Sequence, residues 1–349
     1  MTTILSSFSL LMSLSVFITL IKNDYWLFKI MEYPRLQKLT IVTLTIGVWL
    51  FLHPFDHTSS AISFVLLWVA AGYLVYKISP YTIFTAKEMK KADVGKAIDK
   101  LKVFAANVYQ DNTDYQRLLT QIRSADPDIV FLLETNAAWA NAMRALEADY
   151  PYSLKEPLEN TYGLLFYSRY RLEDAKVNYI VKKGVPSIEA LLHLPSGQKI
   201  KLWGLHPEPP VPGENLYSTA KDKELMKIAF KARDCNLPCI VFGDLNDVAW
   251  SHTTELFRKT SELLDPRRGR GFYPTFSAHS WFIRFPLDYI FASRHFSLIE
   301  MKRLPKNGSD HFATLTHLAF TGIEKDQEPP SADGEELAEA KEIAAKPTR

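Results

Sequence analysis

Six apolar runs in the C-terminal two-thirds of the chain each border a carboxylate, an amide or an imidazole. Side chains of these types can transfer protons and bind hard cations. A single polar residue beside an apolar run usually marks only the point where a strand reaches water. Six such positions together predict that the ends of several strands converge on one cleft, which is a common place for an active site. The residues concerned are Asn107, Glu134, His206, Asp244 with Asn246, Asp288, and Asp310 with His311.

An α/β domain must position these residues, because strand-length apolar runs and helical patterns both occur from about residue 101 onward. Helices are predicted over residues 114–124, 136–148 and 219–233. Some predicted strands are adjacent in the sequence and others are separated by helices, which predicts two sheets covered by helices. The predicted strands are residues 102–109, 129–133, 163–167, 176–181, 188–194, 199–205, 239–242, 287–291, 296–303 and 313–319.

The polar residues also fall within recognisable motifs. In type and order, these motifs resemble the endonuclease/exonuclease/phosphatase superfamily, which includes deoxyribonucleases, abasic-site endonucleases, sphingomyelinases and inositol-polyphosphate phosphatases. The resemblance covers about residues 101–320 and implies a four-layer α/β sandwich of two mixed β-sheets flanked by helices. It also implies metal-dependent hydrolysis of a phosphate ester. The motifs are Asn107, Glu134, Gly243-Asp244-Leu245-Asn246, Leu287-Asp288-Tyr289-Ile290-Phe291 and Ser309-Asp310-His311.

The resemblance implies a cation site for Mg²⁺, with Mn²⁺ as a substitute. Glu134 is the expected ligand, supported by Asn107 and Asp310. Such ions take oxygen ligands and retain several waters, so one or two carboxylates are enough. Cys235 and Cys239 have no second pair of ligands in the sequence, which argues against a zinc site.

The same resemblance implies catalytic roles for five residues. Either Asp244 or His311 would take the proton of the attacking water, with Asp288 orienting the imidazole of His311. Asn246 would donate a hydrogen bond to a phosphate oxygen. His206 would assist the leaving oxygen or stabilise the transition state. The alternative for His206 is a histidine bonded within the proline-rich loop that follows it.

Further residues are candidates for contacts to a phosphate group. The segment Arg267-Arg268-Gly269-Arg270-Gly271 could bind phosphate through guanidinium groups, or could be an exposed basic loop without a partner. Asn160, Tyr162 and Arg169 flank a predicted strand, and the general layout of the family places them near the cleft.

The first 76 residues differ in composition from the rest of the chain. They include three uncharged stretches, at residues 1–21, 39–55 and 58–76, which are close to the length of a membrane-spanning helix. A signal peptide is disfavoured because residues 1–13 contain no lysine or arginine. Tyr25, Trp26 and Tyr33 follow the first stretch and suit the headgroup region. These 76 residues are therefore predicted to be a membrane anchor with three transmembrane helices.

The predicted organisation places a linker at residues 77–100, the hydrolase-like domain at 101–322 and an acidic, disordered tail at 323–349. Lysine and arginine are concentrated after the first and third predicted spans, which favours a cytoplasmic catalytic domain. The whole chain resembles a membrane-anchored bacterial branch of the superfamily, which implies a multi-pass protein of the bacterial inner membrane.

The expected function is that of a membrane-anchored, Mg²⁺-dependent phosphodiesterase. Its expected partners are a lipid bilayer and a phosphodiester substrate, either nucleic acid or a lipid or small phosphoester, and the sequence implies no protein partner. A lipid phosphodiesterase, or a tethered binding module without turnover, is the alternative. A net charge of +2 over 349 residues gives no reason to expect a general polyanion binder, and two cysteines exclude a disulfide framework.

Overall fold

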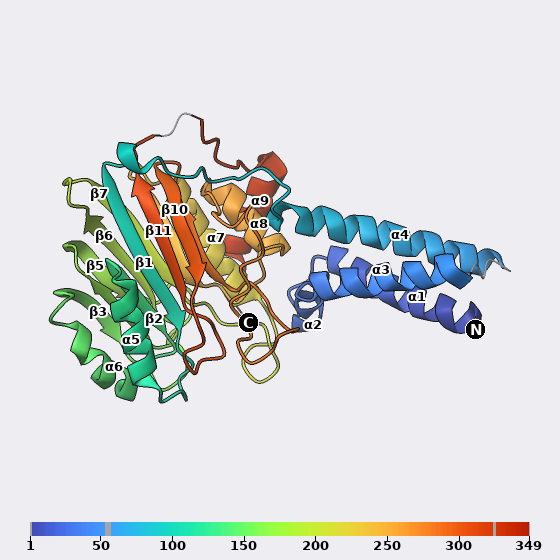
Figure 1. Cartoon of the computed structure of the whole chain (residues 1–349), viewed down its shortest axis with the longest axis horizontal. Coiled ribbons are helices and arrows are strands. Elements are labelled where there is room, and N and C mark those ends of the chain that lie inside the picture. Colours follow the sequence, from blue (N-terminus) through green and yellow to red (C-terminus); the bar gives the residue numbers. More distant parts are fainter. Residues whose placement is uncertain (1, 53–56, 324–325, 349) are drawn as a thin grey trace.

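The chain forms a helical bundle that projects from one side of a larger α/β domain (Figure 1). The computed structural model describes residues 2–52, 57–323 and 326–348. Two mixed β-sheets make up the centre of the domain, as expected from the alternation of strand and helix patterns. The N-terminal bundle and the domain are joined by hydrogen bonds and ion pairs between residues more than 200 positions apart.

One sheet has six strands in the order β10-β11-β1-β2-β4-β3, and the other has five in the order β5-β6-β7-β8-β9. The first sheet consists of β1 (Asp99–Asn107), β2 (Ile129–Leu133), β3 (Tyr152–Glu156), β4 (Leu164–Ser168), β10 (Phe296–Arg303) and β11 (Thr314–Phe320). The second consists of β5 (Leu172–Asn178), β6 (Ser187–His193), β7 (Lys199–Leu205), β8 (Cys239–Asp244) and β9 (Asp288–Ala292).

Helices cover the outer face of each sheet, so the domain has four layers. In β2, Val130 and Leu132 pack in the cluster with the helices outside the first sheet, whereas Phe131 packs between the sheets. Its ring contacts that of Phe242 from the second sheet, at a centroid distance of 5.1 Å. The covering helices are α5 (Tyr115–Ala125) and α6 (Ala137–Ala142) on the first sheet, and α7 (Thr219–Arg233) and α8 (His252–Ser261) on the second. The predicted four-layer sandwich is confirmed.

The strand registers bring the predicted site to one edge of both sheets. Strands β1 and β2 are parallel, with Asn107 opposite Leu133, so Asn107 and Glu134 emerge together. Strands β7 and β8 are also parallel and end at the same level. Strand β9 is antiparallel to β8 and places Asp288 directly opposite Asp244.

The prediction of a disordered tail is wrong for residues 334–345. These residues form α9 (Gly334–Ala345), which packs beside α7 and buries Ala340 against the core of the second sheet. A capping box begins the helix, in which Asp333 accepts from the backbone N–H of Glu336 and the Glu336 side chain accepts from that of Asp333. The capping box and the burial of Ala340 together stabilise this helix, although the acidic composition of the segment predicted disorder.

The predicted linker is packed against the domain along much of its length. Tyr81 is buried and donates a 2.5 Å hydrogen bond to the carbonyl oxygen of Ala249. Glu88 forms ion pairs with Arg258 and Arg268. The connection between the last N-terminal helix and β1 is therefore held in place by the catalytic domain.

Three helices in the N-terminal bundle are long and apolar enough to span a membrane. They are α1 (Thr2–Phe17), which continues in a 3-10 turn to Leu20, α3 (Arg35–Leu52), and α4 (Thr58–Ile78), which continues in a 3-10 turn to Tyr81. The short α2 (Trp26–Ile30) lies between the first two. Part of the second predicted span, residues 53–55, lies outside the described residues. Trp49 of α3 donates a hydrogen bond to Ser9 of α1, which joins two helices inside the bundle.

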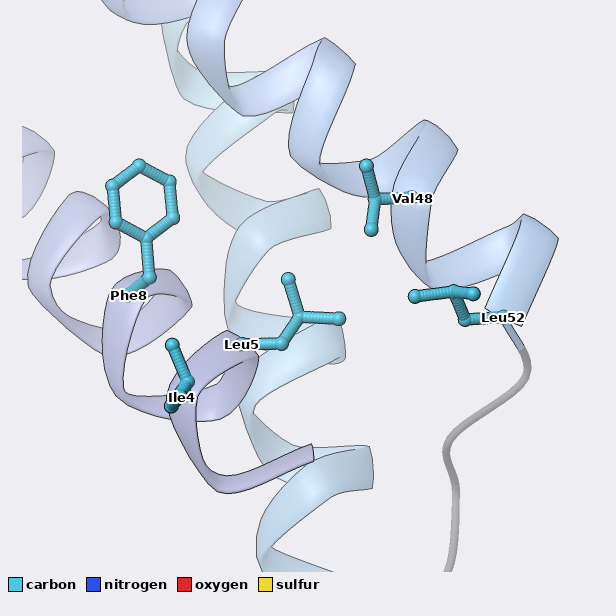
Figure 2. Close-up of a pocket in the computed structure, with 5 residues that line it drawn as sticks. All are labelled: Ile4, Leu5, Phe8, Val48 and Leu52. Carbon is cyan, nitrogen blue, oxygen red and sulfur yellow. The ribbon is translucent and has the colours of Figure 1, made fainter. Parts of the chain in front are cut away.

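An apolar groove lies between α1 and α3, near the end of the bundle away from the catalytic domain (Figure 2). Its lining consists of hydrocarbon side chains that offer neither charge nor acid–base groups. This groove is therefore separate from the residues that could do chemistry. The side chains are Ile4, Leu5, Phe8, Val48 and Leu52.

Candidate active site

The amide of Asn107 joins acidic residues from the two sheets. Its Nδ2 donates to Oε1 of Glu134 at 2.6 Å and to Oδ2 of Asp244 at 3.2 Å. Glu134 follows β2 with a φ of 58°, whereas Asp244 ends β8 and is completely buried. The two carboxylates therefore lie on either side of one amide at the shared edge of the sheets.

The imidazole of His311 lies between Asp244 and one further carboxylate, that of Asp288. Nδ1 of His311 is 2.9 Å from Oδ2 of Asp288, and Nε2 is 3.6 Å from Oδ2 of Asp244. All three residues are buried. The Asp288 contact fixes which ring nitrogen faces β9, leaving the other nitrogen directed toward Asp244.

These neighbours change the acid–base properties of the pair. Burial alone would lower the pKa of His311, but the charges of Asp288 and Asp244 outweigh it and raise that pKa to about 10. Burial raises the pKa of Asp244 to about 7, despite the opposing effect of His311. At neutral pH, His311 is thus cationic, while Asp244 is close to its titration point and able to accept a proton.

The last part of β8, just before the turn, requires glycine at position 243. Gly243 has a φ of 131°, and a Cβ atom there would lie 2.1 Å from the carbonyl oxygen of Leu205 on the neighbouring strand. After the turn, the backbone N–H of Asn246 donates to Oδ1 of Asp244 at 2.9 Å. The motif thereby holds one oxygen of Asp244 and leaves the other facing Asn107 and His311.

The amide of Asn246 connects two loops beside the site. Its Nδ2 donates to the carbonyl oxygen of Pro207 at 3.0 Å. That bond joins the loop after Asp244 to the loop after His206. It uses one of the two N–H donors of the amide, so the hydrogen bond from Asn246 to a phosphate oxygen stays a prediction.

His206 is buried at the end of β7, and its Nδ1 has no hydrogen-bond partner within the described part of the chain. Burial, together with the nearby charge of His311, lowers the pKa of His206 to about 3. Its ring packs against Tyr162 at a centroid distance of 5.4 Å, and the hydroxyl of Tyr162 bonds to Glu214. The alternative was an imidazole hydrogen-bonded within the proline-rich loop. Nδ1 of His206 does not support it, because that atom has no hydrogen-bond partner among the described residues.

Ser309 organises the last motif, although no separate pattern in the sequence indicates its role. Its hydroxyl donates to the carbonyl oxygen of Asn107 at 2.8 Å and accepts from the backbone N–H of His311 at 2.9 Å. The backbone oxygen of Asp310 accepts from the N–H of Ala278 at 2.6 Å. Ser309 thus ties the loop that carries Asp310 and His311 to the end of β1.

The chain matches the Endonuclease/Exonuclease/phosphatase family over residues 104–311. The chain belongs to this family. A sequence search of curated proteins found no match.

Solved structures of the endonuclease/exonuclease/phosphatase fold resemble the domain. A family protein from Beutenbergia cavernae is 18% identical with a TM-score of 0.52, covering 64% of this chain and 72% of its own. Zebrafish (D. rerio) TDP2, solved with a single-stranded DNA product, is 17% identical with a TM-score of 0.52, covering 63% and 98%. The human Nocturnin catalytic domain, solved with a sulfate anion, is 18% identical with a TM-score of 0.51, covering 64% and 97%. The matched shares leave about a third of this chain outside the common fold.

The donor set of this family member fits a divalent cation. Four carboxylates meet at the edge of the sheets, and no lysine or arginine among the described residues forms an ion pair with any of them. Burial raises the pKa of Glu134, and the nearby charge of Asp310 raises it further, whereas Asn107 and His311 oppose the shift. Ligand atoms of Asp244, Asp288 and His311 lie within 4.8 Å of one another, so this buried group could also hold an ion.

The arginine-rich segment 267–271 is not an exposed basic loop without partners. Arg267 is buried, forms an ion pair with Asp265 at 2.7 Å and stacks over the ring of Tyr289. Arg268 binds Glu88 and Glu255. Arg270 donates to two backbone carbonyl oxygens. The segment is therefore part of the scaffold behind β9, where the guanidinium groups of Arg267 and Arg268 are paired with carboxylates.

The three residues around β4 that were predicted to lie near the cleft do not lie together in the structure. Tyr162 lies beside His206, as described above. Asn160 donates to the carbonyl oxygen of Gly184. Arg169 pairs with Asp126 and stacks on Tyr150, where β4 is paired with the beginning of β2. Arg169 therefore lies at the opposite edge of the sheet from Glu134.

Two other arginines lie beside the site of this family member. Arg284 and Arg303 stack on the ring of Phe312, at 5.2 and 4.3 Å from its centroid. Phe312 directly follows His311. Each guanidinium donates to a backbone carbonyl, and neither forms an ion pair within the described ranges of the chain. No motif in the sequence marked them, because they approach Phe312 from separate segments.

Proposed function

We propose that this chain is a membrane-anchored phosphodiesterase that depends on a divalent cation, with Mg²⁺ as the expected ion. The single observation that carries this proposal is the arrangement of Asp288, His311 and Asp244, with Asn107 and Glu134 beside it. A binding module has no need for an imidazole held charged by two buried carboxylates. The family membership supports the same reaction class.

Glu134, Asn107 and Asp310 are proposed to hold the ion. Their oxygens are the ligands that Mg²⁺ prefers, and the local excess of carboxylates favours a cation. When bound, the ion would polarise the phosphoryl group and neutralise charge that develops during the reaction. The carboxylate of Glu134 is buried beside a neutral amide, which is consistent with a further positive partner.

Asp244 is proposed as the base that takes a proton from the attacking water. Its raised pKa makes proton acceptance more favourable than at an ordinary aspartate. His311 would stay protonated and stabilise negative charge on the phosphoryl oxygens, because Asp288 and Asp244 raise its pKa. Between the two alternatives from the sequence, these shifts favour Asp244.

His206 is proposed to hydrogen-bond the leaving or phosphoryl oxygen as a neutral imidazole. Its lowered pKa keeps the ring uncharged, and Nδ1 is a buried polar atom without a partner in the described residues. Such atoms are costly unless they are satisfied when a ligand binds. Asn246 is proposed to position this region through its bond to Pro207.

The N-terminal helices are proposed to anchor the enzyme in the bacterial inner membrane. Their length and hydropathy support spanning. The basic residues after the first and third spans favour a cytoplasmic domain. The substrate is proposed to be a phosphodiester, and the DNA product bound to zebrafish TDP2 makes nucleic acid one class to be tested.

The proposal is tested by incubating the purified chain with plasmid DNA, phospholipid vesicles and a bis-aryl phosphodiester, with and without Mg²⁺. Hydrolysis of at least one substrate by the wild type, lost in Asp244→Ala and without Mg²⁺, supports a metal-dependent enzyme. Failure to hydrolyse any of them, with Asp244→Ala indistinguishable from wild type, would favour the non-catalytic binding module.

A further inference from the structure

Three consecutive large apolar side chains are exposed on the catalytic domain. Trp281, Phe282 and Ile283 are 85%, 48% and 54% exposed. Isolated exposed apolar residues are common on soluble surfaces, but a contiguous group usually marks a contact with a partner or a membrane. The three residues lie at the tip of the loop between Phe276 and Phe285, which pair with each other at its base.

This loop is attached to the beginning of a candidate membrane span. The carbonyl oxygen of Phe282 accepts a 2.8 Å hydrogen bond from Nε2 of Gln37, in the first turn of α3. The uncharged stretch of α3 begins at Leu39, about 3 Å further along the helix at 1.5 Å per residue. The loop tip therefore lies at the level where α3 enters the bilayer, on the side of the domain that faces the bundle (Figure 1).

The other part of the same loop touches the active site. The ring of Phe276 packs on His311 at a centroid distance of 5.0 Å. The N–H of Ala278 donates to the backbone oxygen of Asp310. A few residues thus separate the catalytic imidazole from the apolar tip, and any surface that the tip contacts must lie close to the mouth of the site.

Positive charge next to the tip suits the same surface. Arg284 directly follows Ile283 and stacks with Arg303 on Phe312, and neither has a carboxylate partner in the described parts of the chain. Tryptophan and arginine are both favoured at the boundary between lipid and water, where phosphate groups are concentrated. The exposed apolar residues and the arginines beside them fit a bilayer surface better than a protein partner. The reason is that the loop is bonded to α3, and the bilayer would surround that helix.

We propose that Trp281, Phe282 and Ile283 insert into the headgroup layer of the bilayer that the anchor spans, so that the active site opens onto this leaflet and acts on phosphoesters held in it. The inference rests on the proposed hydrolase function and adds a substrate class to it. The substrate is identified only by its chemistry, as a phosphodiester with a membrane-embedded tail.

Insertion can be measured independently of activity in the full chain reconstituted into vesicles of phosphatidylethanolamine and phosphatidylglycerol. A nitroxide label at Trp281→Cys, in a Cys235→Ser background, should be more accessible to oxygen than to a water-soluble nickel complex. The matched control is Tyr179→Cys, which is 45% exposed in the connection after β5 and should show the reverse. Equal nickel accessibility at both positions would overturn insertion.

Substrate class is tested with two diesters that share the same reacting bond. Nitrophenyl hexadecyl phosphate is supplied in vesicles, and nitrophenyl methyl phosphate in water. In both, water attacks phosphorus and nitrophenolate leaves. The wild type should favour the membrane-held diester, and the triple variant Trp281→Ser/Phe282→Ser/Ile283→Ser should lose that preference by about tenfold. Its activity on the methyl ester should stay within about twofold, because the tip does not touch the reacting atoms.

The outcomes separate the two proposals. If the wild type hydrolyses the methyl ester but shows no preference for the membrane-held diester, the substrate inference is wrong and the hydrolase proposal stands. If it hydrolyses neither diester but cleaves plasmid DNA or the bis-aryl phosphodiester, the substrate inference alone fails; if it hydrolyses none of these substrates, the proposed function fails with it. In each case, the accessibility of the nitroxide label at position 281 still shows whether the loop inserts into the bilayer.

Discussion

The hydroxyl of Tyr33 donates a 2.9 Å hydrogen bond to the carbonyl oxygen of Asn246. Tyr33 lies between the first two candidate spans, and Asn246 lies two residues after Asp244. Nearby, Arg35 donates to the carbonyl oxygen of Trp250 at 2.6 Å. The N-terminal segment between the candidate spans therefore supports the loop that follows the proposed base.

Replacing Tyr33 with phenylalanine should weaken this support without changing the shape of the ring. We expect kcat to fall about threefold to tenfold, since a hydrogen bond of this kind contributes about 1 kcal/mol. Tyr152→Phe, on edge strand β3, is the matched control and should keep wild-type kcat. Equal rates for both variants and the wild type would show that the anchor does not position the site.

Asp288→Asn should shift the pH dependence of activity to lower pH. The ionised base gives an acidic limb near the Asp244 pKa of about 7, and loss of the imidazolium gives an alkaline limb near the His311 pKa of about 10. Asp288 raises both pKa values, so removing its charge lowers both. The measurement is kcat/KM against pH, and an alkaline limb that stays in place would contradict the proposed role of Asp288.

Glu134→Gln should weaken cation binding in a way that thermal unfolding can detect. At a Mg²⁺ concentration of 100 times Kd, a site present only in the folded state stabilises it by about 2.7 kcal/mol. The melting temperature of the wild type should therefore rise with Mg²⁺, and most of the rise should vanish in Glu134→Gln. Glu147→Gln, which removes a surface partner of Lys155, should retain the full increase.

Much of the candidate site could be predicted because its members follow a simple local rule. Each lies at the end of a strand or within a few residues of one, and parallel pairs such as β1 with β2 place Asn107 and Glu134 at one edge. The capping pattern of α9 was also readable, since Asp333 stands three residues before Glu336. The acidic composition of the same segment favours disorder, and the capping box together with the burial of Ala340 outweighs it.

Other parts of the site depend on contacts that no local pattern encodes. The arginines at 267 and 268 bind Asp265, Glu88 and Glu255, and a run of basic residues does not reveal such buried partners. Arg284 and Arg303 meet only because both pack on Phe312. The sequence showed the charges, but tertiary packing decides which of them are free.

Gly243→Ala should damage both stability and activity. Its Cβ would overlap the carbonyl oxygen of Leu205 at 2.1 Å, and the backbone there has a φ of 131°. We expect a loss of about 2 kcal/mol or more in the free energy of unfolding. Gly322→Ala also has a positive φ but meets no atom within 4 Å, so it should cost only about 1 kcal/mol. Similar denaturation midpoints for the two variants would refute the steric argument.

The most direct test is hydrolysis of a bis-aryl phosphodiester by wild type and Asp244→Asn while Mg²⁺ is removed by chelation and then restored. The variant keeps the size of the side chain but removes the charge that accepts the proton. We expect wild-type hydrolysis to disappear on chelation and return with Mg²⁺, and kcat in Asp244→Asn to fall by about a hundredfold or more. Wild-type rates in Asp244→Asn, or hydrolysis that is unaffected by chelation, would contradict a metal-dependent hydrolase in which Asp244 is the base.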